Sequence, residues 1–190
     1  MRRPAIFFLV LLLIFALTAC SREQPPGERV LEIRERFQTS TQRFSAELTA
    51  DYGDRVHHFT LRFDSAASTL EVLAPEIIAG VVIEVSESGT VLSFEGAELN
   101  TGPLTEDGLS PLAALPMIVF QWKEGLITAS HYETFQGIRT VVMTTDISDT
   151  VRHITWFDVE TGIPIKAEIL SDGFAVITVA FEGGPLFGLG

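Results

Sequence analysis

The sequence has a single cysteine, Cys20, and few basic residues, since 13 Lys and Arg stand against 25 Asp and Glu. One thiol excludes a disulfide within the chain and a metal site built from several thiolates. A net charge of -12 disfavours nucleic acid as a partner, because phosphate contacts need Lys and Arg. It also disfavours flat electrostatic binding to anionic lipid. The fold must therefore depend on an apolar core, which a chain of 190 residues can bury.

Long apolar runs are also scarce, and the clearest one opens the chain. Arg2 and Arg3 precede it, residues 5–17 are almost all Ile, Phe, Leu, Val or Ala, and the small residues Thr18 and Ala19 lead to Cys20. A cationic start, a short apolar stretch and a small-residue exit predict an export signal. The run is shorter than the roughly 20 residues that a membrane-spanning helix needs.

The segment Leu17-Thr18-Ala19-Cys20 resembles a bacterial lipobox, in which the cysteine receives a diacylglycerol and becomes the new N-terminus. We predict a signal peptide over residues 1–19 and a lipidated tether over residues 20–27. An uncleaved anchor helix, or an ordinary signal peptide that happens to contain a cysteine, is the alternative. Cleavage removes two arginines, so the net charge of -12 falls to about −14. Two acyl chains on Cys20 suffice for stable attachment to a cell membrane or an outer membrane.

Helical spacing of apolar residues occurs twice in the remaining chain. Residues 28–38 carry one apolar stripe among Arg and Glu, which predicts a first helix. Ser110-Pro111 looks like an N-cap followed by proline at N1, and apolar residues then recur at helical spacing up to Gly125. Pro116 lies inside this second segment and predicts a kink or two short helical pieces.

The rest of the sequence alternates between apolar and polar residues, which predicts half-buried strands. Turn signals separate them. The predicted strands cover 43–52, 56–63, 69–73, 80–86 and 91–94, and after the helical insert 127–135, 138–145, 151–158, 164–170 and 174–181. We therefore expect one mainly β domain with helices (α+β) over residues 28–182, built from about ten to eleven antiparallel strands. A Gly-rich segment, 183–190, is expected to be a flexible or loosely docked tail.

A lipobox, a helix, a meander, a helical lid and a second meander together resemble the LolA, LolB and LppX superfamily. Two stretches carry local resemblance: Leu73-Ala74-Pro75 running on to Gly80, and the hairpin from Thr155 to Glu168 with its D-x-x-T-G-x-P turn. The resemblance implies a curved antiparallel half-barrel with helices on its concave face and an apolar cavity for acyl chains. It also implies a lipid, acyl-chain or lipoprotein ligand. The GerS-type lipoproteins of spore-forming bacteria are similar, and that branch implies a cell-envelope enzyme as protein partner instead.

Apolar residues on the expected concave face and lid are the candidate cavity lining. They are Phe44, Leu48, Phe59, Leu61, Phe63, Ile83, Leu112, Leu115, Val119, Trp122 and Trp156, with Val81, Val85, Ile118 and Ile154 as further members. An ordinary packed core without a cavity is the alternative, because protein interiors fill to crystal-like density by default. An exposed apolar loop of the LolB type would lie at 74–78 or 186–189.

Residues with catalytic or metal-binding chemistry are sparse. His57 and His58 are neighbours in a strand and point to opposite faces. His131 and Glu133 share a face, but a metal needs further ligands. No G-x-S-x-G segment and no phosphate-binding Gly-rich loop occurs in the sequence. We therefore expect no enzyme, no metal and no cofactor, and we expect the membrane and a lipid or envelope protein as partners.

Overall fold

The computed structural model describes residues 24–64, 69–86, 89–102 and 108–188. Cys20 and the predicted signal peptide lie outside these residues. Within the described ranges, two helices, α2 (Pro26–Thr39) and α3 (Pro111–Glu124), and a short 3-10 helix, η1 (Glu76–Ile78), accompany one sheet. The strands are β1 (Thr41–Asp51), β2 (Val56–Asp64), β3 (Thr69–Ala74), β4 (Val82–Ser86), β5 (Gly89–Phe94), β6 (Ala97–Gly102), β7 (Ile127–Phe135), β8 (Ile138–Asp146), β9 (Val151–Asp158), β10 (Pro164–Ser171) and β11 (Phe174–Gly188).

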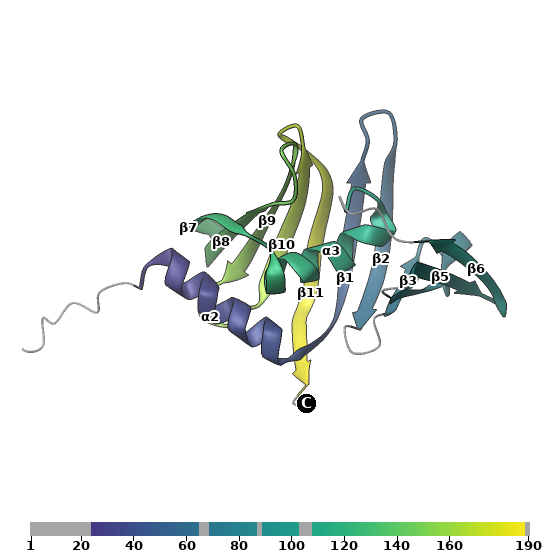
Figure 1. Ribbon diagram of the computed structural model, residues 1–190, viewed down its shortest axis with the longest axis horizontal. Helices are drawn as coiled ribbons and strands as arrows, with labels where there is room; N and C mark the ends of the chain where they lie inside the picture. Colours follow the sequence, from purple (N-terminus) through teal and green to yellow (C-terminus); the bar gives the residue numbers. More distant parts are fainter. Residues whose placement is uncertain (1–23, 65–68, 87–88, 103–107, 189–190) are drawn as a thin grey trace, which may run out of the picture.

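All eleven strands form one open antiparallel sheet in the order β6-β5-β4-β3-β2-β1-β11-β10-β9-β8-β7 (Figure 1). Strands β1–β6 are one meander and β7–β11 are a second. The first and last strands join them, with Leu48 opposite Val179 and Ala46 opposite Phe181. Helix α3 connects the two outer strands, β6 and β7. This layout confirms the predicted fold class, a curved antiparallel half-barrel with an N-terminal helix and a mid-chain helix.

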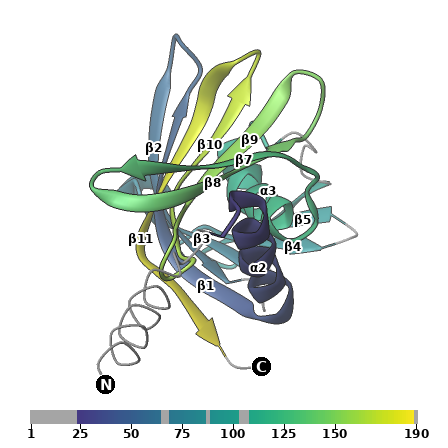
Figure 2. The same ribbon diagram turned by 90° about the vertical axis from the view of Figure 1, so that its left-hand side faces the viewer.

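Both helices lie on the concave side of the sheet, which curves around them in the side view (Figure 2). In β1, Phe44, Ala46, Leu48 and Ala50 are buried and alternate with more exposed residues. Their partners across the sheet and the apolar stripe of α2 join them in one core. The stripe consists of Val30, Ile33 and Phe37, which are 0–1% exposed. The strand alternation and the helical stripe therefore meet in the same layer.

Several boundaries differ from the sequence predictions. The segment expected as a flexible tail belongs to β11 as far as Gly188, and Gly188 is opposite Thr41. Strand β6 occupies residues 97–102, where no strand was predicted. The predicted tether is shorter, because α2 already begins at Pro26.

Helix α3 is continuous from Pro111 to Glu124, so the predicted division into two pieces is wrong. A proline removes one helical hydrogen bond, the one from its own nitrogen. Pro116 is only the sixth residue of the helix, and the first four backbone N–H groups of any helix have no partner within it. The hydrogen bond lost at Pro116 therefore lies next to the first turn of α3, whose N–H groups need partners outside the helix in any case. One such partner is the Ser110 side chain, whose Oγ accepts from Ala113 N at 3.4 Å.

Candidate functional site

Helix α3 fills the space that the sequence analysis assigned to a cavity. Its buried residues are 0–5% exposed: Ala113, Ala114, Leu115, Ile118, Val119, Gln121 and Trp122. The walls of an open cavity would leave more of their atoms uncovered. The concave side is therefore packed at this helix.

Most of the predicted cavity residues come together in this core. Phe44, Leu48, Leu61, Phe63, Ile83, Leu115, Ile118, Val119 and Trp122 are 0–5% exposed, and Phe59, Val81 and Leu112 are partly buried against them. The side chain of Val85 lies outside those that the structure describes. Sequence reasoning thus identified many of the residues that form one core with α3.

Two of the predicted residues lie on the other face of the sheet. Trp122 Nε1 donates to Thr155 Oγ1, so Thr155 points toward α3. Its neighbours in β9, Ile154 and Trp156, must then point to the convex face, because strand side chains alternate. Assigning them to the concave face was wrong. A Trp was assumed to be an inward residue, but hydrophobicity alone does not select the face of a strand.

Trp122 is the centre of an aromatic cluster. Its ring centroid lies 4.8 Å from that of Phe37, 5.4 Å from Phe181 and 5.6 Å from Phe157. These residues come from α2, β11 and β9. Tilted and edge-on aromatic pairs of this spacing contribute beyond the area that they bury. The indole thus holds α3 against α2 and against strands of the sheet.

A chain of buried polar groups continues from the indole into the sheet. Thr155 Oγ1 lies 2.8 Å from His153 Nε2, and Thr145 Oγ1 lies 3.3 Å from His153 Nδ1. His153, Thr145 and Thr155 are 0% exposed. Burial lowers the pKa of His153 to about 3, so its imidazole is neutral at physiological pH. A neutral ring offers one donor and one acceptor, which two hydroxyl groups can satisfy.

The sequence analysis did not single out His153. The signal was present, because Val151, His153, Thr155 and Phe157 alternate along β9 and share one face. A histidine and a threonine between two apolar residues predict a buried polar pair.

Helix α2 binds the C-terminal end of α3. Arg34 Nε donates to Trp122 O at 3.1 Å, and Arg34 Nη2 donates to Gly125 O at 2.5 Å. Gln38 Nε2 donates to Lys123 O at 2.8 Å. Partial burial lowers the pKa of Arg34, but the group stays charged. A cation at a helix C-terminus satisfies the last carbonyl groups and the helix dipole, so these contacts fix α3 in place.

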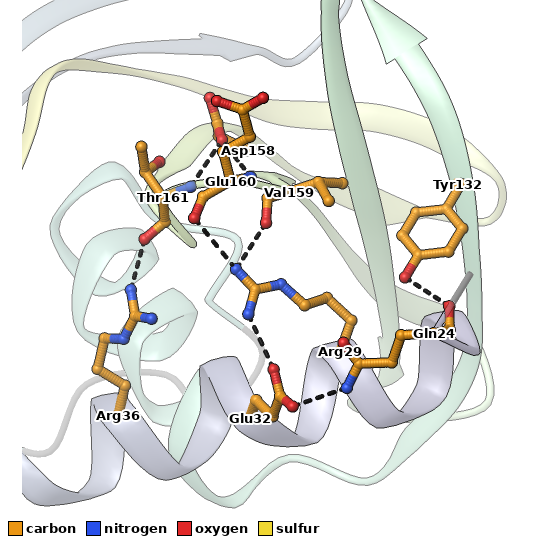
Figure 3. A network of polar contacts seen from close by, with 9 residues as sticks. All are labelled: Gln24, Arg29, Glu32, Arg36, Tyr132, Asp158, Val159, Glu160 and Thr161. Atoms are coloured by element: carbon orange, nitrogen blue, oxygen red, sulfur yellow. Dashed lines mark hydrogen bonds and ion pairs between the residues drawn. The ribbon is translucent and has the colours of Figure 1, made fainter. Parts of the chain in front are cut away.

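The same helix is tied to the D-x-x-T-G-x-P turn between β9 and β10 (Figure 3). Arg29 Nη2 donates to Val159 O at 2.6 Å, and Arg36 Nη1 donates to Thr161 O. Asp158 Oδ1 accepts from the backbone nitrogens of Glu160 and Thr161 at 2.7 and 2.8 Å, which shapes the turn. The hairpin that carries the family resemblance therefore binds the N-terminal helix α2 through hydrogen bonds to its turn.

The convex face carries a cation–aromatic cluster, made of Phe135, Trp156 and Lys166. Lys166 Nζ lies 4.9 Å from the ring centroid of Trp156 and 5.4 Å from that of Phe135. Glu133 accepts from Trp156 Nε1. All three residues of the cluster are only half-buried. The convex face thus presents two aromatic rings, a Lys ammonium and a Glu carboxylate side by side.

Half-open pockets occur at the ends of strands. One of about 610 Å³ is lined by the β1–β2 and β10–β11 turns, including Tyr52 and Phe174, and by Leu109. Phe174 is 77% exposed, and Tyr52 Oη donates to Leu109 O at 2.9 Å. A second pocket, of about 420 Å³, includes Phe59 and Pro75. Next to it Ile77 of η1 is 86% exposed, within the 74–78 segment considered as a loop. Residue 189 of the other candidate lies outside the described residues.

Metal ligation was also considered for the histidines. His131 Nε2 lies 3.3 Å from Glu133 Oε2, so these two share a face as predicted. Within the described residues, no group of three or more His, Cys, Asp and Glu side chains is placed to hold a metal ion. Nor is any helix there long and apolar enough to cross a membrane.

Comparison with known proteins finds similarity in solved structures alone. No protein-family model matches the sequence, and no curated protein matches it. LppX of Mycobacterium tuberculosis has a TM-score of 0.45 and 13% identity, covering 84% of this chain and 92% of that one. A LolA superfamily protein of Nitrosomonas europaea has a TM-score of 0.43 and 11% identity, covering 86% and 94%.

A third similar structure is the CwlD amidase of Clostridioides difficile in complex with the GerS lipoprotein. Its TM-score is 0.44 at 14% identity, and the match covers 86% of this chain and 96% of that one. At such distances the similarity concerns the layout and carries no conclusion about ligands or partners. The strand order and helix positions define this layout as a curved antiparallel half-barrel with two helices on its concave side.

Proposed function

We propose that the mature chain is a lipoprotein, anchored through diacylglycerol on Cys20 at an extracytoplasmic membrane face. Its role is to bind an envelope protein with its outer surface, and not to catalyse a reaction. The lipobox-like segment Leu17–Cys20 supports the anchor, and the packed concave side supports the binding mode. An acyl chain inside the half-barrel would need an apolar cleft of several hundred Å³. The buried side chains of α3 are instead 0–5% exposed, which favours a packed interior.

Uptake of an apolar probe tests the packed interior. The domain from Ser21 onward is incubated with a fluorescent fatty acid, and a Leu115→Ala variant, which removes a fully buried side chain from α3, is incubated with benzene beside the wild type. We expect no fatty acid in the wild type and benzene binding in the variant alone, because the apolar cavity left by one Leu→Ala change can hold benzene but not an acyl chain. Stoichiometric uptake by the wild type would overturn a packed interior.

The partner is tested on the lipidated protein. Native purification from its own membrane is expected to recover one envelope protein at equal stoichiometry, and a photo-crosslinker in the convex cation–aromatic cluster is expected to capture it. A crosslinker at Phe120, which is 53% exposed on α3, is the control position. Equal capture at both positions, or a bound acylated molecule with no protein, contradicts a specific protein partner.

Lipid or lipoprotein binding is the second candidate, favoured by the apolar side chains around the pocket of about 610 Å³. Its volume falls in the range of small-molecule sites. Native mass spectrometry of the wild type and of Phe174→Ser distinguishes the two functions. A lipid adduct that the substitution abolishes would replace the protein-binding proposal.

A further inference from the structure

The expected anchor and the first described residue are close together in the chain. Three residues separate Cys20 from Gln24, and an extended chain spans at most about 3.6 Å per residue. Gln24 therefore lies within roughly 14 Å of an acylated Cys20. Whatever orientation the domain adopts, the surface around Gln24 must be close to the lipid headgroups.

That surface is made by the start of α2 and by the β7–β8 hairpin. Tyr132 Oη of β7 donates to Gln24 O at 2.9 Å (Figure 3). The guanidinium carbon of Arg139, at the start of β8, lies 5.1 Å from the centroid of the Tyr132 ring. Arg139 is exposed. An aromatic ring with a polar tip and an exposed guanidinium thus adjoin the point where the chain leaves the domain.

The composition of this hairpin differs from that of the acidic chain around it. Residues 125–138 hold one carboxylate, Glu133, and no Lys or Arg. Two exposed apolar side chains bracket β7: Leu126 is 74% exposed and Ile138 is 40% exposed. Low charge reduces repulsion from anionic lipid, and Tyr suits the membrane–water interface.

Strand β7 is also an outer strand of the sheet. Edge strands are commonly protected against other chains by Lys, by Pro or by bulges. Strand β7 contains neither Lys nor Pro, and its pairing with β8 has one register shift, between Ile127 and Ala129. An edge held against a membrane is less accessible to another chain, so the absence of Lys and Pro from β7 agrees with the short tether.

We propose that the start of α2 and the β7–β8 hairpin lie against the phospholipid headgroups of the membrane that holds Cys20. Tyr132 lies at the interface and Arg139 contacts lipid phosphate, because a guanidinium pairs with phosphate oxygens. The other edge strand, β6, then points away from the membrane, since it lies at the opposite end of the long axis (Figure 1). This inference rests on the lipid anchor of the proposed function.

The test uses the full-length protein, acylated in a bacterial host and reconstituted into vesicles of phosphatidylethanolamine and phosphatidylglycerol. Cys20 is the only cysteine, so an introduced cysteine is a unique free thiol once Cys20 is acylated. Ile138→Cys reports on the hairpin. Leu99→Cys on β6, which is 62% exposed, is the matched control at the other edge. Each thiol carries a nitrobenzoxadiazole label, and the vesicles contain a spin-labelled lipid quencher.

We expect at least twofold stronger quenching at position 138 than at position 99. Adding Arg139→Glu should reduce the quenching at 138 while the protein still floats with the vesicles. Flotation with equal quenching at the two positions overturns the orientation and leaves the anchor intact. A protein that does not float, and whose Cys20 is unmodified by mass spectrometry, overturns the anchor and this inference together.

Discussion

Replacing Trp122 by Ala tests whether the concave side is a packed core. The indole is 1% exposed and lies within 4.8–5.6 Å, centroid to centroid, of Phe37, Phe181 and Phe157. Large-to-small changes of a buried Phe or Trp cost about 3–5 kcal/mol. The lost hydrogen bond to Thr155 adds about 1 kcal/mol, because the hydroxyl is left in a dry site. We expect the free energy of unfolding to fall by about 4–6 kcal/mol.

Urea unfolding of the domain from Ser21 onward, followed by circular dichroism, measures this loss. Phe120→Ala is the matched control, because Phe120 belongs to the same helix and is 53% exposed. The control should change the free energy of unfolding by less than about 0.5 kcal/mol. A loss below about 1.5 kcal/mol for Trp122→Ala would contradict the reasoning, since it would mean that the ring had lain against empty space.

Three further predictions concern other contacts. Burial lowers the pKa of His153 to about 3 in the folded state, whereas the pKa of histidine in the unfolded chain is near 6.5. Between these two values the unfolded state binds more protons than the folded state. The free energy of unfolding should therefore fall as the pH drops from 6.5 toward 3. His153→Gln should flatten this dependence by roughly 1 kcal/mol per pH unit, measured by urea unfolding at pH 7 and pH 5; identical profiles would refute it. Arg34→Ala should cost about 2 kcal/mol, because two carbonyl groups at the end of α3 lose a charged donor. The control for Arg34→Ala is Arg62→Ala, which breaks an exposed ion pair with Glu71 and should cost under about 1 kcal/mol in the same assay. Cys20→Ser should leave the folded domain unchanged by circular dichroism and move it from the membrane to the soluble fraction; membrane fractionation of the variant would refute the anchor.

The regular alternation of apolar residues made most of the sheet predictable. The pattern around Phe44 and Leu48 in β1 could be read directly, because each strand has one buried face. Strand β6 was missed because all of its residues with a described exposure are exposed, so it carries no alternation. It pairs with β5 in a hairpin closed by the two-residue turn Glu95-Gly96, in which both residues have positive φ, and the sequence analysis did not use this turn signal.

The candidate site was predictable in part for the same reason. Spacing predicted that Leu115, Val119 and Trp122 face the sheet, and they do. Spacing could not decide between a packed layer and a cavity, because both need the same apolar residues. The difference lies in how closely α3 approaches the sheet, and the contacts of Arg34 and Gln38 with its last turn set that approach.

The turn between β9 and β10 shows how a local motif acquires a long-range role. Asp158, Gly162 and Pro164 suit the turn for local reasons, which is why the sequence pattern is visible. The turn also presents the carbonyl groups of Val159 and Thr161 to Arg29 and Arg36, more than a hundred residues earlier. An added Cβ at Gly162 would lie 2.9 Å from Arg36 Nη1 and 3.3 Å from Ile33 Cγ1. The φ of +69° is what favours glycine at this position, and the approach of α2 leaves little room for a side chain beside Ile33. Since α2 in turn holds the end of α3, this turn contributes to keeping the concave side closed.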